Sequence, residues 1–235
     1  ITVGDIDGNG LDDIFLGASK GYSPQILLQQ PDGKFIQKDF TTAVNQYDTK
    51  MENRGVLLFD ADGDGDLDLY VTGGSVESPA GSPDYQDKLY ENIGKGHFRL
   101  DTAALPVNHT SKSVVIAADF DHDGDLDLFV GGRVEPGKYP SPVSSIILRN
   151  DSKNGQIKFT DITGSIAPIL HNIGMVSDAL WTDFNNDGWP DLILAGEWMP
   201  LTFLENDHGH FKNITAQTGI GNETGWWNSL VSGDF

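Results

Sequence analysis

The sequence predicts an all-β fold, a β-propeller made of four-stranded antiparallel blades. Three observations predict it. An Asp-rich pattern of nine residues recurs four times with a period of roughly 55–60 residues, which is typical of repeat architectures. Short apolar, β-branched runs flank the copies, as expected of β-strands. Glycine accounts for 28 of the 235 residues, which indicates many turns and few long helices.

The second repeat illustrates the expected order of elements. A predicted strand at 56–59 leads into the Asp-rich stretch, and a second strand follows at 67–71. A third strand with a polar turn is expected at 89–94, and a fourth opens with Phe98. Glycine-rich loops are expected between the second and third strands, at 17–19, 73–75, 131–133 and 195–197. Four strands per repeat match a propeller blade, and neighbouring blades must stack because one sheet cannot bury both of its faces alone.

The repeat boundaries follow from this order. We expect one propeller-type domain over 1–235, with repeats at 1–53, 54–111, 112–174 and 175–225, and the start of a fifth at 226–235. The first strand of the fifth repeat is expected around Leu230 and Val231, and a fifth Asp-rich copy begins at 233–235. Because the two ends of the chain occupy the same place in the repeat, we expect an open part of a larger propeller.

The Asp-rich pattern is D-x-[DN]-x-[DN]-G-x-x-D, at 5–13, 60–68, 119–127 and 183–191. Oxygen ligands at positions 1, 3 and 5 of a tight loop converge on one point, and glycine at position 6 permits the sharp turn. A main-chain carbonyl at position 7 and a carboxylate at position 9 can complete a shell of calcium type, whereas magnesium prefers to keep its waters. One Asp-Gly-rich copy is equally compatible with an ordinary hairpin turn, but four in register favour metal binding. An EF-hand is excluded because position 12 is apolar in every copy.

Charge and composition exclude several classes of function. Lys and Arg total 15 against 35 Asp and Glu, a formal net charge of -20, so phosphate backbones and anionic membranes should repel the chain. No apolar run approaches the roughly 18 residues of a membrane span. There is no cysteine, and we found no catalytic motif: the phosphate-loop spacing at 132–138 ends in Tyr139 instead of Ser or Thr.

Two further groups of side chains are candidates for binding sites. Trp226 and Trp227 follow a glycine-rich turn and form a possible ligand platform, for sugars or for a protein partner. His208 and His210 are interpreted as exposed turn histidines rather than metal ligands.

The amino-acid sequence of the repeats resembles that of a known family. The run 119–132, DFDHDGDLDLFVGG, is similar to the FG-GAP or VCBS-type repeats of integrin-like β-propellers, and the runs 89–92 and 159–163 resemble the bacterial branch related to cartilage acidic proteins, often followed by an ASPIC/UnbV segment. The resemblance implies calcium in strand–loop–strand hairpins, about four ions per chain. It also implies a secreted or surface location and a role in adhesion or ligand binding.

Carried onto this sequence, the resemblance implies four sets of metal ligands. They are Asp5, Asp7, Asn9, the Leu11 carbonyl and Asp13; Asp60, Asp62, Asp64, the Asp66 carbonyl and Asp68; Asp119, Asp121, Asp123, the Asp125 carbonyl and Asp127; and Asp183, Asn185, Asp187, the Trp189 carbonyl and Asp191.

Two functions from different classes remain open. The first is a calcium-binding propeller, extracellular, on the cell surface or periplasmic, that binds a protein or carbohydrate ligand and is not an enzyme. The second is a calcium-dependent propeller enzyme, such as a polysaccharide lyase. The sequence predicts no nucleic-acid partner and no membrane span for either one.

Overall fold

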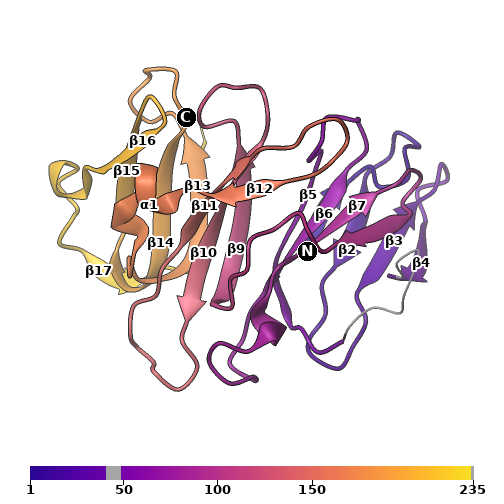
Figure 1. Cartoon of the computed structure of the whole chain (residues 1–235), viewed down its shortest axis with the longest axis horizontal. Helices are drawn as coiled ribbons and strands as arrows, with labels where there is room; N and C mark the ends of the chain where they lie inside the picture. Colours follow the sequence, from indigo (N-terminus) through magenta and orange to yellow (C-terminus); the bar gives the residue numbers. More distant parts are fainter. Residues whose placement is uncertain (41–48, 234–235) are drawn as a thin grey trace.

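The described residues form four antiparallel sheets that follow one another in chain order (Figure 1). The computed structural model describes residues 1–40 and 49–233. The first sheet contains β1 (Thr2–Gly4), β2 (Asp13–Leu16), β3 (Gln25–Gln29) and β4 (Phe35–Asp39). The second contains β5 (Asn53–Phe59), β6 (Asp68–Gly73), β7 (Lys88–Asn92) and β8 (Phe98–Asp101). The third contains β9 (Ser111–Ala118), β10 (Asp127–Val134), β11 (Ile146–Asn150) and β12 (Phe159–Asp161).

The fourth sheet has one strand more than the others. It contains β13 (Met175–Thr182), β14 (Asp191–Pro200), β15 (Thr202–Asp207) and β16 (His210–Asn213), and β17 (Thr224–Trp226) pairs with the second half of β14. The described helices are short: α1 (Thr163–Ile166), η1 (Pro83–Tyr85), η2 (Pro168–Leu170) and η3 (Thr215–Gln217). None of them has the length and apolar character needed to cross a membrane. The predicted all-β propeller of four-stranded blades is confirmed.

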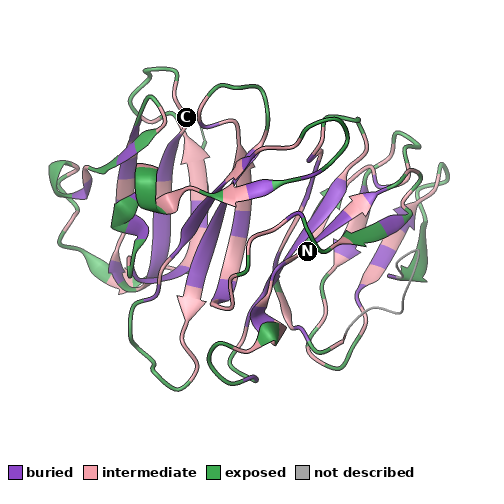
Figure 2. Ribbon diagram, in the orientation of Figure 1, coloured by how far each residue is buried: buried purple, intermediate pink, exposed green. Residues whose placement is uncertain are grey.

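Successive side chains of the second strand in each sheet point to opposite faces, and this explains how the sheets stack. Leu128 and Val130 of β10 pack in the core shared with the second sheet, whereas Phe129 packs in the core shared with the fourth. In the same way, Leu69 of β6 faces the first sheet and Tyr70 faces the third. Successive side chains of a strand point to opposite faces, so a strand that is apolar at every position is buried on both. Figure 2 shows this burial along the central strands and exposure in the loops.

The first strands of the sheets lie in a row. β1 contacts β5, β5 contacts β9, and β9 contacts β13. A side-chain hydrogen bond connects β9 to β13: the hydroxyl group of Ser113 donates to the carbonyl of Val176 at 2.6 Å. The equivalent residue of β13, Ser177, donates to the carbonyl of Trp227. Trp227 therefore lies beside β13 as Val176 lies beside β9.

Two details of the sequence prediction need correction. Residues 227–233 form no strand, and 234–235 lie outside the described residues. The glycine-rich segments 131–133 and 195–197 are not loops but lie within β10 and β14. Glycine is needed there because a Cβ on Gly132 would lie 2.1 Å from the Ser144 carbonyl oxygen.

Candidate metal-binding loops

Each Asp-rich stretch forms the hairpin loop between the first and second strands of its sheet. The aspartate at position 9 is the first residue of the second strand in every case, namely Asp13 of β2, Asp68 of β6, Asp127 of β10 and Asp191 of β14. We refer to residues 5–13, 60–68, 119–127 and 183–191 as loops one to four. All four therefore lie at the same end of their sheets.

Two left-handed residues give each loop its shape. Position 6 is glycine with positive φ in all four loops, from 83° at Gly10 to 97° at Gly124, as the sequence predicts. Position 4 is also left-handed, and here two loops use a non-glycine residue, His122 with φ 61° and Asn186 with φ 60°. A left-handed backbone disfavours side chains other than glycine and, to a lesser degree, asparagine. The second left-handed position was not predicted from the sequence.

The aspartate at position 1 organises the loop backbone. In loop one, Asp5 accepts hydrogen bonds from the main-chain N–H groups of Gly8, Asn9 and Gly10, at 2.8 to 3.0 Å. The other loops repeat the bond from position 6, with Asp60 accepting from Gly65 at 3.0 Å. These bonds draw the loop around the carboxylate at position 1. Equivalent bonds are made by Asp119 and Asp183.

The side chains at positions 3 and 5 form successive Asx turns. Asp7, Asp62, Asp121 and Asn185 accept from the N–H at position 5, and Asn9, Asp64, Asp123 and Asp187 accept from the N–H at position 7. The N–H donors at position 7 are those of Leu11, Asp66, Asp125 and Trp189. These turns bend the chain so that alternate side chains share one side of it.

Carboxylates from positions 1, 3 and 9 converge in three loops. In each, one oxygen atom from every carboxylate lies within 4.8 Å of the others: Asp5, Asp7 and Asp13; Asp60, Asp62 and Asp68; Asp119, Asp121 and Asp127. Asp64 and Asp123, predicted as ligands at position 5, lie outside these groups of acids. Loop four has Asn185 at position 3, and its side-chain amide donates to Asp187 at 2.8 Å. Metal binding by the four predicted sets of ligand residues remains a prediction.

The aspartate at position 9 is the buried carboxylate of each loop. Asp13, Asp127 and Asp191 are fully buried, and Asp68 is 2% exposed. Burial raises the pKa of Asp68 and of Asp127 to about 7, and the pKa values of Asp13 and Asp191 are raised for the same reason. A buried carboxylate needs a partner for its charge. Oδ2 of Asp127 is buried and has no hydrogen-bond partner among the described residues, so loop three holds an oxygen that a cation can satisfy.

An asparagine at the end of the third strand joins neighbouring loops. Asn92 donates its main-chain N–H to Asp68, and its side-chain amide donates to the carbonyls of Leu67 and Ile6, at 3.2 and 3.0 Å. Ile6 belongs to loop one, and its own N–H donates to Asp13. Asn92 therefore binds the position-9 aspartate of its own loop and the backbone of the preceding loop.

The same bridge recurs twice. Asn150 donates to Asp127, Leu126 and, in loop two, Ala61. Asn206 does the same for Asp191, Pro190 and, in loop three, Phe120. The Asp-rich pattern does not include these residues, although asparagine at this place in three repeats is a signal in the sequence. In the first sheet Gln29 occupies the place and donates its main-chain N–H to Asp13 at 2.7 Å.

Trp226 and Trp227, which were predicted to form a ligand platform, lie in different environments. Trp226 is 59% exposed and lies edge-on to Trp198, with ring centroids 5.6 Å apart. Trp227 is only partly exposed, and its indole N–H is buried without a partner. His208 lies in the exposed turn between β15 and β16, where it contacts Asp207, and its ring packs near Trp189 of loop four. Trp189 also stacks on His122 of loop three at 4.2 Å, a second contact between adjacent loops.

Comparison with known proteins places these repeats in a family. A family model described as an FG-GAP-like repeat matches residues 5–71, 77–130 and 183–235. Cartilage acidic protein 1 of Mus musculus is 29% identical over 220 residues, and that of Xenopus tropicalis is 31% identical over 219 residues. Each alignment covers 91% of this chain and 31% of the relative, so the chain spans about a third of the length of these curated relatives.

A solved structure named as an exo-beta-1,3-galactanase from Bifidobacterium bifidum s17 matches with a TM-score of 0.49 and 11% identity, over 89% of this chain and 71% of that one. A likeness of this degree says nothing about activity. The family match, by contrast, covers more than half of the chain and includes all four loops in full. The chain therefore belongs to the FG-GAP-like repeat family.

Proposed function

We propose that the chain is a calcium-binding propeller segment that holds about four Ca²⁺ ions, one in each loop. The observation that carries this proposal is the convergence of carboxylates from positions 1, 3 and 9 in loops one to three. Hard oxygen donors in a flexible loop suit calcium, while magnesium demands near-ideal octahedral geometry and keeps several waters. The buried, unpartnered Oδ2 of Asp127 fits the same donor set. Loop four offers Asn185 in place of one carboxylate, so its ligand set carries less charge.

The role of calcium in this proposal is structural. Each loop lies between the first and second strands of a sheet, and the asparagine bridges connect it to the next loop. Without a cation, three or four carboxylates repel one another at short range. With four ions bound, the formal net charge changes from -20 to -20 + 8 = -12. Ca²⁺ thus holds together the part of each blade on which the next blade depends.

For the whole protein we propose an extracellular, cell-surface or periplasmic module for adhesion or ligand binding, with a protein or carbohydrate partner. Membership of the FG-GAP-like repeat family and the similarity to cartilage acidic protein 1 support this role. The clustered carboxylates are assigned to metal binding rather than to acid–base chemistry. We therefore propose a binding function rather than catalysis.

Calorimetric titration of the chelator-stripped chain with CaCl₂ tests the metal assignment. We expect about four bound ions, and much weaker binding of MgCl₂. Asp62→Asn and Asp121→Asn should each weaken or abolish one site. Asp207→Asn is the matched control, because it makes the same charge change at an exposed residue outside the loops. Absence of calcium binding, or an equal effect of the control, would contradict the assignment.

A screen for unsaturated products from uronate-containing polysaccharides tests the proposed absence of catalysis. We expect no turnover in calcium-saturated protein. Sustained product formation that calcium chelation abolishes would favour a polysaccharide lyase instead.

A further inference from the structure

A cavity of about 370 Å³ opens at the end of the sheets opposite to loops one to four. Its wall includes Arg54 at the start of β5, Arg133 at the end of β10, and Glu197 in the second half of β14. The metal loops follow the ends of the first strands, so these residues lie at the other ends of the same hairpins. Three sheets contribute to the cavity, and its volume falls in the range of small-ligand sites.

One wall of the cavity is a fixed polar network. Arg133 pairs with Glu197 and also donates to the carbonyl of Met175 at 3.3 Å. Tyr139 donates its hydroxyl hydrogen to the second carboxylate oxygen of Glu197 at 3.1 Å. The indole N–H of Trp198 in turn donates to the Tyr139 hydroxyl oxygen at 2.9 Å. Both oxygens of Glu197 are thereby engaged, and both terminal nitrogens of Arg133 are held, one by Glu197 and the other by the Met175 carbonyl.

Exposed aromatic rings lie on the same side. Trp226 lines the cavity and is 59% exposed, and Trp198 supports it in an edge-to-face contact at an interplanar angle of 79°. The pairing of β17 with β14 fixes Trp226 opposite Glu197. Trp198 has a φ of 59°, a left-handed conformation that costs energy in a tryptophan. Rings held in this way present an apolar surface beside charged groups.

Arg54 provides a second guanidinium group at the cavity. A Cβ on Gly74 would lie 2.1 Å from Cγ of Arg54, so the side chain packs closely over this glycine. Nη1 of Arg54 lies 3.4 Å from Glu52, and its side chain is 50% exposed. Two arginines thus line the cavity, and each contacts a glutamate, Arg54 with Glu52 and Arg133 with Glu197.

We propose that this cavity binds a uronic acid residue of an acidic polysaccharide. An exposed indole face suits the C–H face of a pyranose ring, and a guanidinium fork pairs with a carboxylate in a bidentate manner. Trp226 supplies the first feature, and the half-exposed guanidinium group of Arg54 supplies the second. The inference rests on the proposed binding function and names its ligand class, a carbohydrate rather than a protein.

Calorimetric titration of the full chain in saturating calcium tests the proposal, with digalacturonic acid as the probe and neutral galactobiose as the comparison. We expect digalacturonic acid to bind at least tenfold more tightly than galactobiose. Trp226→Ala should weaken the acidic sugar at least tenfold. Arg54→Gln should do the same and remove most of the preference for the acidic sugar, while Arg54→Lys should retain part of it. Tyr22→Ala, at another exposed aromatic residue, should have no effect.

Several results would overturn the proposal. They are no binding of digalacturonic acid at millimolar concentration, equal binding of galactobiose, unchanged affinity in Trp226→Ala, or tighter binding of a short Asp/Glu peptide. Thermal unfolding with and without calcium, measured on the same samples, separates this inference from the proposed function. A calcium-dependent melting temperature without uronate binding rejects the ligand class alone. A melting temperature that does not respond to calcium rejects the structural role of the loops.

Discussion

The side-chain amide of Asn150 donates to the carbonyl of Ala61 at 2.9 Å, across 89 positions of sequence and from the third sheet to loop two. The main-chain N–H of Asn150 donates to Asp127 of loop three at 2.8 Å. One buried residue therefore contacts two candidate metal loops, and Asn92 and Asn206 do the same at the neighbouring boundaries. This arrangement makes the loops parts of one network rather than four independent sites.

Replacing Asn150 with Ala should destabilise the fold and weaken calcium binding in loops two and three. The substitution removes the donors to the carbonyls of Ala61 and Leu126. Leaving buried acceptors unsatisfied costs about 1–3 kcal/mol each. Urea denaturation and calorimetry measure the two effects. Asn222→Ala, at an exposed residue, is the control and should change neither. An Asn150→Ala protein as stable as the parent would show that the hydrogen bonds of Asn150 do not stabilise the fold.

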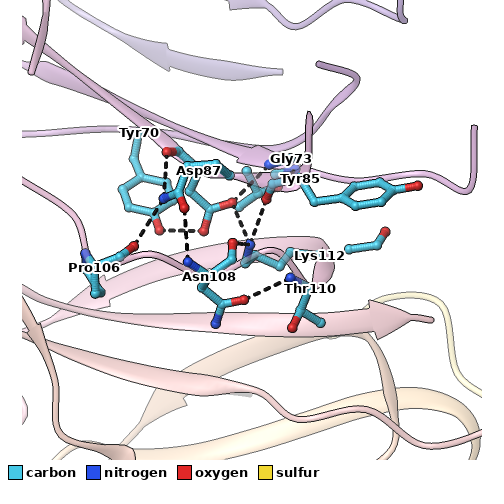
Figure 3. A network of polar contacts seen from close by, with 12 residues as sticks. Tyr70, Gly73, Tyr85, Asp87, Pro106, Asn108, Thr110 and Lys112 are labelled. Atoms are coloured by element: carbon cyan, nitrogen blue, oxygen red, sulfur yellow. Dashed lines mark hydrogen bonds and ion pairs between the residues drawn. The ribbon is translucent and has the colours of Figure 1, made fainter. Parts of the chain in front are cut away.

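Lys112 is the cation of a buried network between the second and third sheets (Figure 3). Its Nζ lies 3.2 Å from Asp87 and donates to the carbonyls of Tyr85 and Asn108, both at 2.9 Å. Asp87 also accepts from the Tyr70 hydroxyl at 2.8 Å. Burial lowers the pKa of Lys112 and raises that of Asp87, while each charge opposes the shift of the other.

Lys112→Met should lower the free energy of unfolding by about 3–5 kcal/mol, because it leaves Asp87 buried without its counter-charge. The double variant with Asp87→Asn should recover part of that loss. Lys138→Met, which breaks an exposed pair with Glu135, should cost no more than about 1 kcal/mol. Denaturant unfolding of the three variants makes the comparison. Equal losses for Lys112→Met and Lys138→Met would contradict the assigned role of the buried pair.

Gly124→Ala should destabilise loop three through the backbone alone. Gly124 has a φ of 97°, and a Cβ there would meet no atom within 4 Å, so the cost is conformational rather than steric crowding. A left-handed conformation costs an alanine about 1–2 kcal/mol. Gly164→Ala is the control, since its Cβ would also meet nothing and its φ is not in the left-handed region. Thermal unfolding should show a loss for Gly124→Ala only; a similar loss for both would exclude this explanation.

Asn185→Asp should tighten calcium binding in loop four. It restores the carboxylate that loops two and three carry at position 3, and ligand charge tunes calcium affinity. In the parent chain, loops two and three should bind calcium most tightly. Asn186→Asp makes the same charge change at the neighbouring position 4, which is not a predicted ligand, and should have a smaller effect. Titration followed by NMR resolves the individual loops. Equal affinity in all four parental loops would contradict the ranking.

Much of this architecture could be predicted from the sequence because it is local. The spacing of Asp119, Asp121 and Asp127 predicts a hairpin loop, and Gly124 predicts its left-handed turn, since both depend on residues within one loop. The apolar run that includes Leu128 and Phe129 likewise predicts a strand, because that pattern lies within a few consecutive residues.

The interactions between blades could not be predicted in this way. The bond from Asn150 to Ala61 and the pair of Lys112 with Asp87 join different repeats, and nothing in the spacing says which side chains meet. Trp226 and Trp227 are adjacent in sequence, yet only Trp226 lines the cavity, because the pairing of β17 with β14 decides which ring is exposed.

The melting temperature of the chain in excess calcium and in EGTA, with metal analysis of both samples, tests the central claim most directly. A ligand that binds only the folded state stabilises it by about 2.7 kcal/mol at one hundred times its Kd, and four such sites would rival the roughly 5–15 kcal/mol stability of an ordinary domain. We predict a sharp fall of the melting temperature in EGTA and its recovery when calcium is returned. An unchanged melting curve in protein shown to be free of metal would contradict the structural role of the loops.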